Sequence, residues 1–161
     1  MNFLALDAAT EYSGVVVVKN EQPVEWHILR ARGFDVWDRI ADFGEQLQGL
    51  LYHHEIEVVG YEYPSGNSSH STNLKLGALM YQAIRTFRIY RDTGEWYNNS
   101  RMLFVKPSQV KKTGAHKDAI GVAAEYLETR FTWSTKAEKK RIGNVADAVG
   151  IWLHFRENGY E

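Results

Sequence analysis

Apolar residues near the N-terminus predict three consecutive strands. The stretches MNFLALDAAT, GVVVVKN and VEWHILRA are rich in apolar and β-branched residues, and the turn sequences EYSG and NEQP separate them. Connections this short predict an antiparallel meander. Within the first stretch Phe3, Ala5 and Asp7 share one face, so a carboxylate follows two apolar side chains.

The spacing of apolar residues then changes to helices that alternate with strands. Residues 34–55 carry a helical stripe that we expect to face the core, and its members are Trp37, Ile40, Gly44, Leu47 and Leu51. The stretch IEVVGYEYP predicts a fourth strand that Pro64 ends, and LKLGALMYQAIRTFRIYR predicts a second helix. A fifth strand is expected at RMLFVKP, a short helical start at Pro107, and a third helix at HKDAIGVAAEYLETRF.

The last part of the chain predicts a polar connector followed by a helix. We interpret TWSTKAEKKRIGN as the connector and expect the last helix to run from Asn144 to Arg156. The whole order predicts an α/β fold in one domain, residues 1–161. Its five-stranded mixed sheet would have three antiparallel strands, then parallel ones, with helices on both faces. The fourth strand can lie parallel to the first through a right-handed crossover.

Composition narrows the setting of the protein. The 161 residues include no cysteine, which excludes disulfides and thiolate metal sites. The N-terminus lacks a secretion signal pattern, and the longest strongly apolar run, GVVVV, is too short to cross a membrane. We therefore expect a cytoplasmic protein with no membrane partner. Net charge is −1, but residues 101–141 are strongly basic, which indicates either a face for a polyanion or ordinary variation along a soluble chain.

Three carboxylates occur in apolar surroundings. Asp7 and Glu62 lie late in the first and fourth predicted strands, and Asp147 lies in the apolar part of the last helix. Each strand carboxylate alone could simply face water at a strand end. Together, three clustered carboxylates repel one another unless cations neutralise them, and Mg²⁺ or Mn²⁺ suit such oxygen ligands. Two such ions can activate water and stabilise the leaving oxygen of a phosphodiester, so the pattern predicts metal-dependent phosphodiester hydrolysis.

Several stretches resemble the RuvC-type Holliday junction resolvases. They are LALDAATEYSG, VGYEYP, STNLKLG, PSQVKKTGAHK and NVADAVGIWLH, which occur in the family's order and span most of the chain. The resemblance implies a ribonuclease H-like fold and divalent-metal-dependent cleavage of four-way DNA junctions by a homodimer. The small size of the chain indicates a phage-like or divergent member, acting in a bacterial or phage-infected cytoplasm.

The resemblance also implies roles for individual residues. Asp7, Glu62 and Asp147 match the family's metal-binding acids. Lys117 and Lys111, or Lys112 in place of Lys111, match lysines that contact DNA phosphate or support the transition state.

Two positions depart from the family pattern. Asn144 stands where a carboxylate or histidine is usual, three residues before the last acid. It is either a neutral metal ligand or the cap of the last helix. The family's base-stacking wedge has two candidates here, Tyr63 and His70.

Other polar residues leave two interpretations open. Ser71 and Asn73, with Lys75 in the same stretch, could contact DNA phosphates, or the segment could be a loop with a helix cap. The basic run Lys139–Arg141 could contact phosphate or be a solvated connector. His53 and His54 end the first helix, where we expect them to interact with the helix dipole rather than a metal.

The leading hypothesis is a junction-resolving endonuclease that uses Mg²⁺, with Mn²⁺ as a substitute. The first alternative is a nuclease of the same fold that acts on flaps, forks or other branched DNA. The second is a DNA-binding module that has lost catalysis. The second helix leaves one further question, because its apolar residues Leu76, Leu79 and Met80 could belong to the core or to a dimer interface.

Overall fold

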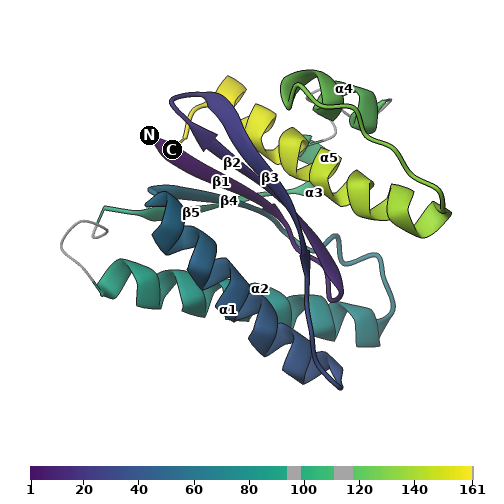
Figure 1. Cartoon of the computed structure of the whole chain (residues 1–161). Helices are drawn as coiled ribbons and strands as arrows, with labels where there is room; N and C mark the ends of the chain where they lie inside the picture. Colours follow the sequence, from purple (N-terminus) through teal and green to yellow (C-terminus); the bar gives the residue numbers. More distant parts are fainter. Residues whose placement is uncertain (94–98, 111–117, 161) are drawn as a thin grey trace.

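The protein is a five-stranded sheet between two layers of helices, as Figure 1 shows. The structure is a computed structural model that describes residues 1–93, 99–110 and 118–160. The strands are β1 (Asn2–Asp7), β2 (Tyr12–Lys19), β3 (Gln22–Arg30), β4 (Val58–Glu62) and β5 (Arg101–Val105). The helices are α1 (Val36–His54), α2 (His70–Asp92), α3 (Pro107–Val110), α4 (Ala119–Tyr126) and α5 (Lys136–Asn158).

The strand order is β3-β2-β1-β4-β5. The first three strands pair antiparallel, whereas β4 pairs parallel with both β1 and β5. The mixed sheet predicted from the order of elements is therefore confirmed. Parallel neighbours need long connections, and here α1 carries the chain from β3 to β4 while α2 carries it from β4 to β5.

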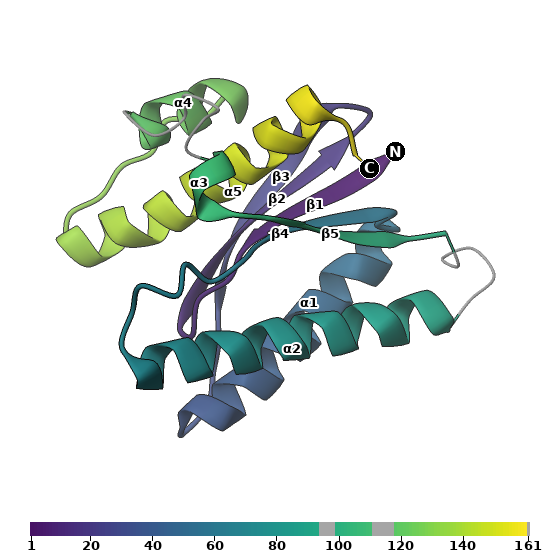
Figure 2. The same cartoon turned by 180° about the vertical axis from the view of Figure 1, so that it is seen from behind.

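Alternation along the central strands divides the core into two halves. Phe3 and Ala5 of β1 pack on the side of α4 and α5, whereas Leu4 and Leu6 pack on the side of α1 and α2. Figure 2 shows these helix pairs on opposite faces of the sheet. Because Asp7 continues the alternation of Phe3 and Ala5, it belongs to the face that α5 covers.

The last helix is longer than predicted. It begins at Lys136, within the segment interpreted as a connector, and ends at Asn158. A capping box starts it: the Thr135 hydroxyl accepts from the Glu138 N–H at 3.1 Å, and the Glu138 carboxylate accepts from the Thr135 N–H at 3.3 Å. The interpretation of Asn144 as the helix cap is wrong, because Asn144 lies in the third turn.

The first helix also differs in one position. Trp37 was expected in the core, but 56% of it is exposed. The buried stripe begins one turn later, at Ile40, and continues through Phe43, Leu47 and Leu51. Trp37 lies in the first turn beside the exposed residues Phe34 and Asp38, so the apolar spacing extends past the end of the core. None of the helices within the described parts of the chain is long and apolar enough to cross a membrane.

Candidate active site

Three carboxylates from distant parts of the sequence surround one cavity. Asp7 ends β1, Glu62 ends β4 and Asp147 lies in α5, and all three line a cavity of about 350 Å³. The other lining residues are Ala8, Tyr61, Tyr63, Pro64, Ser65, Leu76, Pro107 and Val110. The cavity lies at the carboxyl ends of the parallel strands, which is where open α/β sheets bind their ligands.

The register of the sheet brings the two strand carboxylates side by side. Leu6 and Tyr61 are paired in the parallel ladder of β1 and β4, so the residues that follow them, Asp7 and Glu62, leave the sheet together. Alternation then turns both toward α5, because Phe3 and Val58 on the same faces of their strands pack in the half of the core that α5 closes.

A glycine lets α5 approach the sheet closely enough to add the third carboxylate. Gly14 of β2 is directly opposite Asp7 in the antiparallel ladder. A Cβ at Gly14 would overlap with the backbone of Asn144, so the helix backbone packs against a position without a side chain. Asp147 lies one helical turn further along α5. The contact at Gly14 therefore fixes the height of Asp147 above Asp7.

The three carboxylates affect one another electrostatically. The pKa of Asp7 is raised well above its ordinary value, first by burial and then by the negative charges of Asp147 and Glu62. Burial, followed by the charge of Asp7, also raises the pKa of Tyr61 beneath the site. An uncompensated cluster of this kind favours either a retained proton or a bound cation.

The chemistry of the donors suits a hard divalent ion. Carboxylate oxygens are the ligands that Mg²⁺ and Mn²⁺ prefer, and the charge on the site would offset theirs. The three acids do not crowd around a single point, however. Within the described parts of the chain, one group of three acids or histidines has ligand atoms that all lie within 4.8 Å of one another. It consists of Glu25, His53 and His54, which lie away from the carboxylate cavity. The ligand atoms of Asp7, Glu62 and Asp147 are therefore not all within 4.8 Å of one another.

Asn144 has a definite structural contact. Its side-chain N–H donates to the Tyr12 carbonyl oxygen at 2.7 Å and so fastens α5 to the start of β2. Asn144 is not one of the described residues that line the carboxylate cavity. The donor is committed to the sheet, which leaves Oδ1 as the atom that could face a cation. Its role as a metal ligand stays a prediction.

Replacing Asn144 with Asp is expected to destabilise the fold. The substitution removes the donor to the Tyr12 carbonyl and sets two acceptors against each other, at a cost of about 1–3 kcal/mol. Urea unfolding without divalent ions measures this effect. As a control, Asn158→Asp at the exposed end of α5 should cost less. Unchanged stability of Asn144→Asp would mean that the hydrogen bond contributes nothing.

The predicted DNA-contacting residues divide into two groups. Lys111, Lys112 and Lys117 lie outside the described residues. Ser71, Asn73 and Lys75 lie in the first two turns of α2, where Ser71 is exposed. The Asn73 amide donates to the carbonyls of Gly66 and Ser68 at 3.2 and 3.0 Å, which holds the preceding loop in place. The proposed contacts of all six residues with DNA remain predictions.

The two wedge candidates lie at the ends of the same loop. Tyr63 follows β4 and is partly exposed, and its ring stacks on Phe104 at a centroid distance of 4.9 Å. His70 is the first residue of α2 and is exposed. Tyr63 also lines the carboxylate cavity, whereas His70 does not, so Tyr63 is the better placed of the two to contact a substrate bound there.

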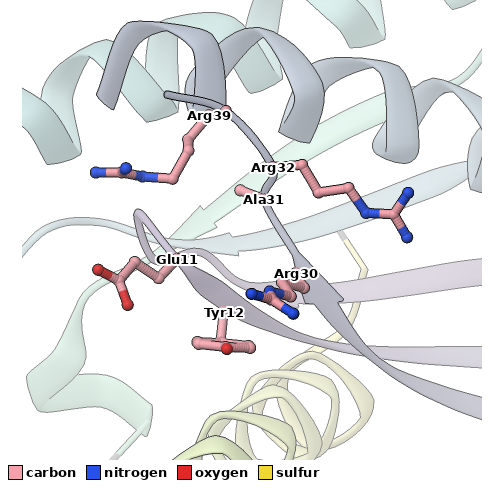
Figure 3. A pocket seen from close by; sticks show the side chains of 7 residues that line it. Glu11, Tyr12, Arg30, Ala31, Arg32 and Arg39 are labelled. Carbon is pink, nitrogen blue, oxygen red and sulfur yellow. The ribbon is translucent and has the colours of Figure 1, made fainter. Parts of the chain in front are cut away.

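An arginine surface that no sequence pattern predicted lies at the same end of the sheet. It consists of Arg30, Arg32, Arg39 and Arg141. The first three line a cavity of about 490 Å³ with Glu11, Tyr12, Ala31 and Gly33, and Arg141 stacks on the Tyr12 ring at 3.9 Å. Figure 3 shows Arg39 and Glu11 extending to one side of this cavity and Arg32 to the other. The residues 1–62 are acidic in sum, which hid the local excess of arginine.

Further basic side chains lie next to the carboxylates. Asp147 also lines a second cavity, of about 620 Å³, together with Arg130 and Lys139. The Lys139 ammonium lies over the Trp133 ring at 5.3 Å. Lys106 lines another cavity, next to the carboxylate cavity. The two cavities share the lining residues Tyr63, Pro64, Ser65 and Pro107. Cationic groups therefore flank the acidic site on two sides.

Comparisons with solved structures find the same architecture in junction resolvases. No protein-family profile matches the sequence, and no curated protein matches it. The structure of Thermus thermophilus RuvC in complex with a Holliday junction substrate has a TM-score of 0.75 at 14% identity, over 99% of this chain and 97% of that one.

One eukaryotic and one viral structure have lower TM-scores. The yeast mitochondrial Holliday junction resolvase has a TM-score of 0.56 at 12% identity, over 98% of this chain and 81% of that one. The Fowlpox virus resolvase, solved with Holliday junction DNA, has a TM-score of 0.55 at 12% identity over the whole of both chains. At these identities the likeness establishes the fold. The chain therefore has the ribonuclease H-like fold of RuvC, as the resemblance in sequence implied.

Proposed function

We propose that the protein is a metal-dependent endonuclease that resolves four-way DNA junctions. Asp7, Glu62 and Asp147 would hold two Mg²⁺ ions, for which Mn²⁺ would substitute, with Asn144 as a weaker ligand. Residues 1–161 would form one nuclease domain acting in the cytoplasm of a bacterial or phage-infected cell. The observation that carries this proposal is the meeting of three carboxylates around one cavity, at the carboxyl ends of β1 and β4 in a fold shared with RuvC.

The residues of the chain would divide the work of hydrolysis. When bound, the ions would activate water and stabilise the leaving oxygen of the phosphodiester. The negative charges of both Asp147 and Glu62 raise the pKa of Asp7, which supports Asp7 as the ligand that the two ions would share. Lys117 would offset negative charge on the phosphate.

The arginine surface would hold a DNA arm beside the cavity. Arginine binds phosphate oxygens through several N–H donors, and phosphate contacts dominate nucleic-acid affinity. Tyr12 starts β2 directly after the loop that follows Asp7, so the arginine surface and the carboxylates lie at one end of the sheet. A junction is wider than the catalytic cavity, and its arms need contacts of this kind outside it.

Removing one arginine should weaken junction binding in a salt-dependent manner. Arg32→Ala should lower affinity equally for all junction sequences. If Arg32 contacts one phosphate, the slope of log K against log salt should fall by about 0.9. Titrations at several salt concentrations with a catalytically inactive chain measure both quantities. Arg91→Ala, at the far end of α2 where Arg91 pairs with Asp92, is the matched control. Equal slopes for the wild type and Arg32→Ala would remove Arg32 from the DNA interface.

A homodimer would suit symmetric cleavage of two opposing strands. The second helix offers a surface for it, because Leu74 is 59% exposed and Tyr81 is 67% exposed on the same side of α2. Leu79, by contrast, is buried in the core against α1, and Leu76 and Met80 are half-buried. The interface would therefore use the outer face of α2 rather than the residues that close the core.

A panel of DNA substrates tests the proposed activity. Four-way junctions, flaps, forks and linear duplexes should be incubated with the wild-type chain and with Asp147→Asn, in Mg²⁺ and in Mn²⁺. The proposal predicts cleavage of the four-way junction alone by the wild type and none by Asp147→Asn. Comparable cleavage of flaps and forks would favour the broader nuclease. Junction binding without cleavage in either ion would favour the non-catalytic DNA-binding module.

A further inference from the structure

A second group of potential metal ligands lies at the opposite end of the sheet from the carboxylate cavity. Glu25 and His27 come from β3, and His53 and His54 are the last two residues of α1. Glu25 and His27 are two residues apart on a strand, so they share the face toward α1. Figure 1 shows the end of α1 near the N-terminus of β1, whereas Asp7 lies at the other end of that strand.

The spacing of the ligand atoms matches that of a coordination shell. Oε2 of Glu25 lies 3.0 Å from Nε2 of His27 and 3.2 Å from Nε2 of His54. Ligands at about 2.0–2.1 Å from a tetrahedral ion are separated by about 3.3 Å, so the Glu25–His54 pair is close to that edge length. The ligand atoms of Glu25, His53 and His54 all lie within 4.8 Å of one another, and His53 is exposed and can turn.

The buried imidazole lacks the hydrogen bond that its position calls for. The His54 side chain is 3% exposed, and its Nε2 is buried without a hydrogen-bond partner, although the Glu25 carboxylate is 3.2 Å away. Burial lowers the pKa of His54, and the charges of His53, Lys19 and His27 lower it further against the opposing effect of Glu25. When the His54 proton is on Nδ1, the Nε2 lone pair faces the Glu25 carboxylate, and a cation between these two acceptors would satisfy both.

The backbone around the histidine is held in place independently of any ion. The Asn2 side-chain amide donates to the His54 carbonyl at 2.9 Å and ties the end of α1 to the start of β1. The partners on both elements are thus presented by regular secondary structure. This is the preorganisation that a metal site requires.

The donor set selects the class of metal. Two imidazoles and one carboxylate suit borderline first-row ions, whereas Mg²⁺ and Ca²⁺ prefer oxygen ligands. We propose that Glu25, His53 and His54 form a site for an ion such as Zn²⁺, while His27 hydrogen-bonds to the Glu25 carboxylate beside it. The ion would join β3 to the end of α1, and the site is independent of the proposed nuclease chemistry.

Cobalt titration of the whole chain tests this proposal. Co²⁺ substitutes for Zn²⁺ and reports nitrogen and oxygen ligands by its visible absorbance. After treatment with a chelator, the wild-type chain should bind one Co²⁺ with these bands. His53→Ala and Glu25→Gln change partly exposed residues and should each weaken binding at least about tenfold, with His54→Ala weakening it more. His70→Ala, an exposed histidine at the start of α2, should bind as the wild type does.

Two comparisons separate this site from the carboxylate cavity. The Co²⁺ bands should persist in Asp7→Asn, and Mg²⁺-dependent cleavage should persist in His53→Ala. Bands that are unchanged in both His53→Ala and Glu25→Gln would overturn the proposal, as would bands lost in Asp7→Asn. Absence of visible bands at millimolar Co²⁺ would mean that the cluster shares only a proton, which would also overturn it.

Discussion

Replacing Asp7 with Asn is expected to abolish cleavage of a synthetic four-way junction and to leave junction binding intact. The amide removes a negative charge and one potential metal-binding oxygen from the centre of the carboxylate cluster, while the side chain keeps its size. We expect the rate to fall at least about 100-fold, which corresponds to about 2.7 kcal/mol of transition-state stabilisation. Single-turnover cleavage in Mg²⁺, with binding measured in Ca²⁺, separates the two effects.

The stability of the same variant shows whether the loss of activity is chemical. The raised pKa of Asp7 means that the folded chain holds a proton at pH values where the unfolded chain has lost it. The free energy of unfolding therefore falls as the pH rises from the ordinary pKa of Asp, about 3.9, through the raised folded value. Without divalent ions, Asp7→Asn removes this penalty and should be more stable than the wild type at high pH.

Added Mg²⁺ should reverse that order. The ion offsets the repulsion among the carboxylates in the wild type and binds Asp7→Asn less tightly, so the melting temperature of the wild type should gain more. Asp92→Asn, at an exposed position, is the control and should change neither quantity. Cleavage by Asp7→Asn at the wild-type rate would contradict the assignment of the carboxylate cavity as the active site. Lower stability without metal would contradict the raised pKa of Asp7.

Local patterns in the sequence were sufficient to predict the sheet and its carboxylates. Strand alternation and short turns determine the meander, and helical segments between β3, β4 and β5 require parallel pairing with crossovers. Asp7 and Glu62 could be identified because a carboxylate in an apolar strand is costly unless something compensates it. The same reasoning applied to Asp147 in α5.

Other features depend on contacts that no local pattern contains. The arginine surface joins the end of β3, α1 and α5, and the cluster of Glu25 with His53 and His54 joins a strand to the end of a helix. One error was avoidable, because Thr135 and Glu138 have the T-x-x-E spacing of a capping box and mark the true start of α5. The polarity of the first turns concealed it, since they face solvent.

Replacing Gly14 with Ala is expected to destabilise the fold and to impair cleavage by moving the helix that carries Asp147. The added Cβ would overlap with the backbone of Asn144 and approach the Val145 nitrogen to 2.5 Å. Backbone cannot turn aside as a side chain can, so α5 must shift away from β2. Overpacking of this kind costs about 1–3 kcal/mol. Urea unfolding measures the cost, and junction cleavage well below the melting temperature measures the effect on the site.

A matched glycine distinguishes this steric effect from a general effect of alanine. Gly49 lies in α1 with open space where its Cβ would be, so Gly49→Ala should stabilise the chain by about 0.5–1 kcal/mol through helix propensity. Cleavage by Gly49→Ala should match the wild type, whereas Gly14→Ala should cut more slowly even when fully folded. The reason is that Gly14 lies opposite Asp7 in the ladder, and Asp147 follows the contact by about one turn. Wild-type stability and activity of Gly14→Ala would show that α5 does not depend on this contact to bring its carboxylate to the sheet.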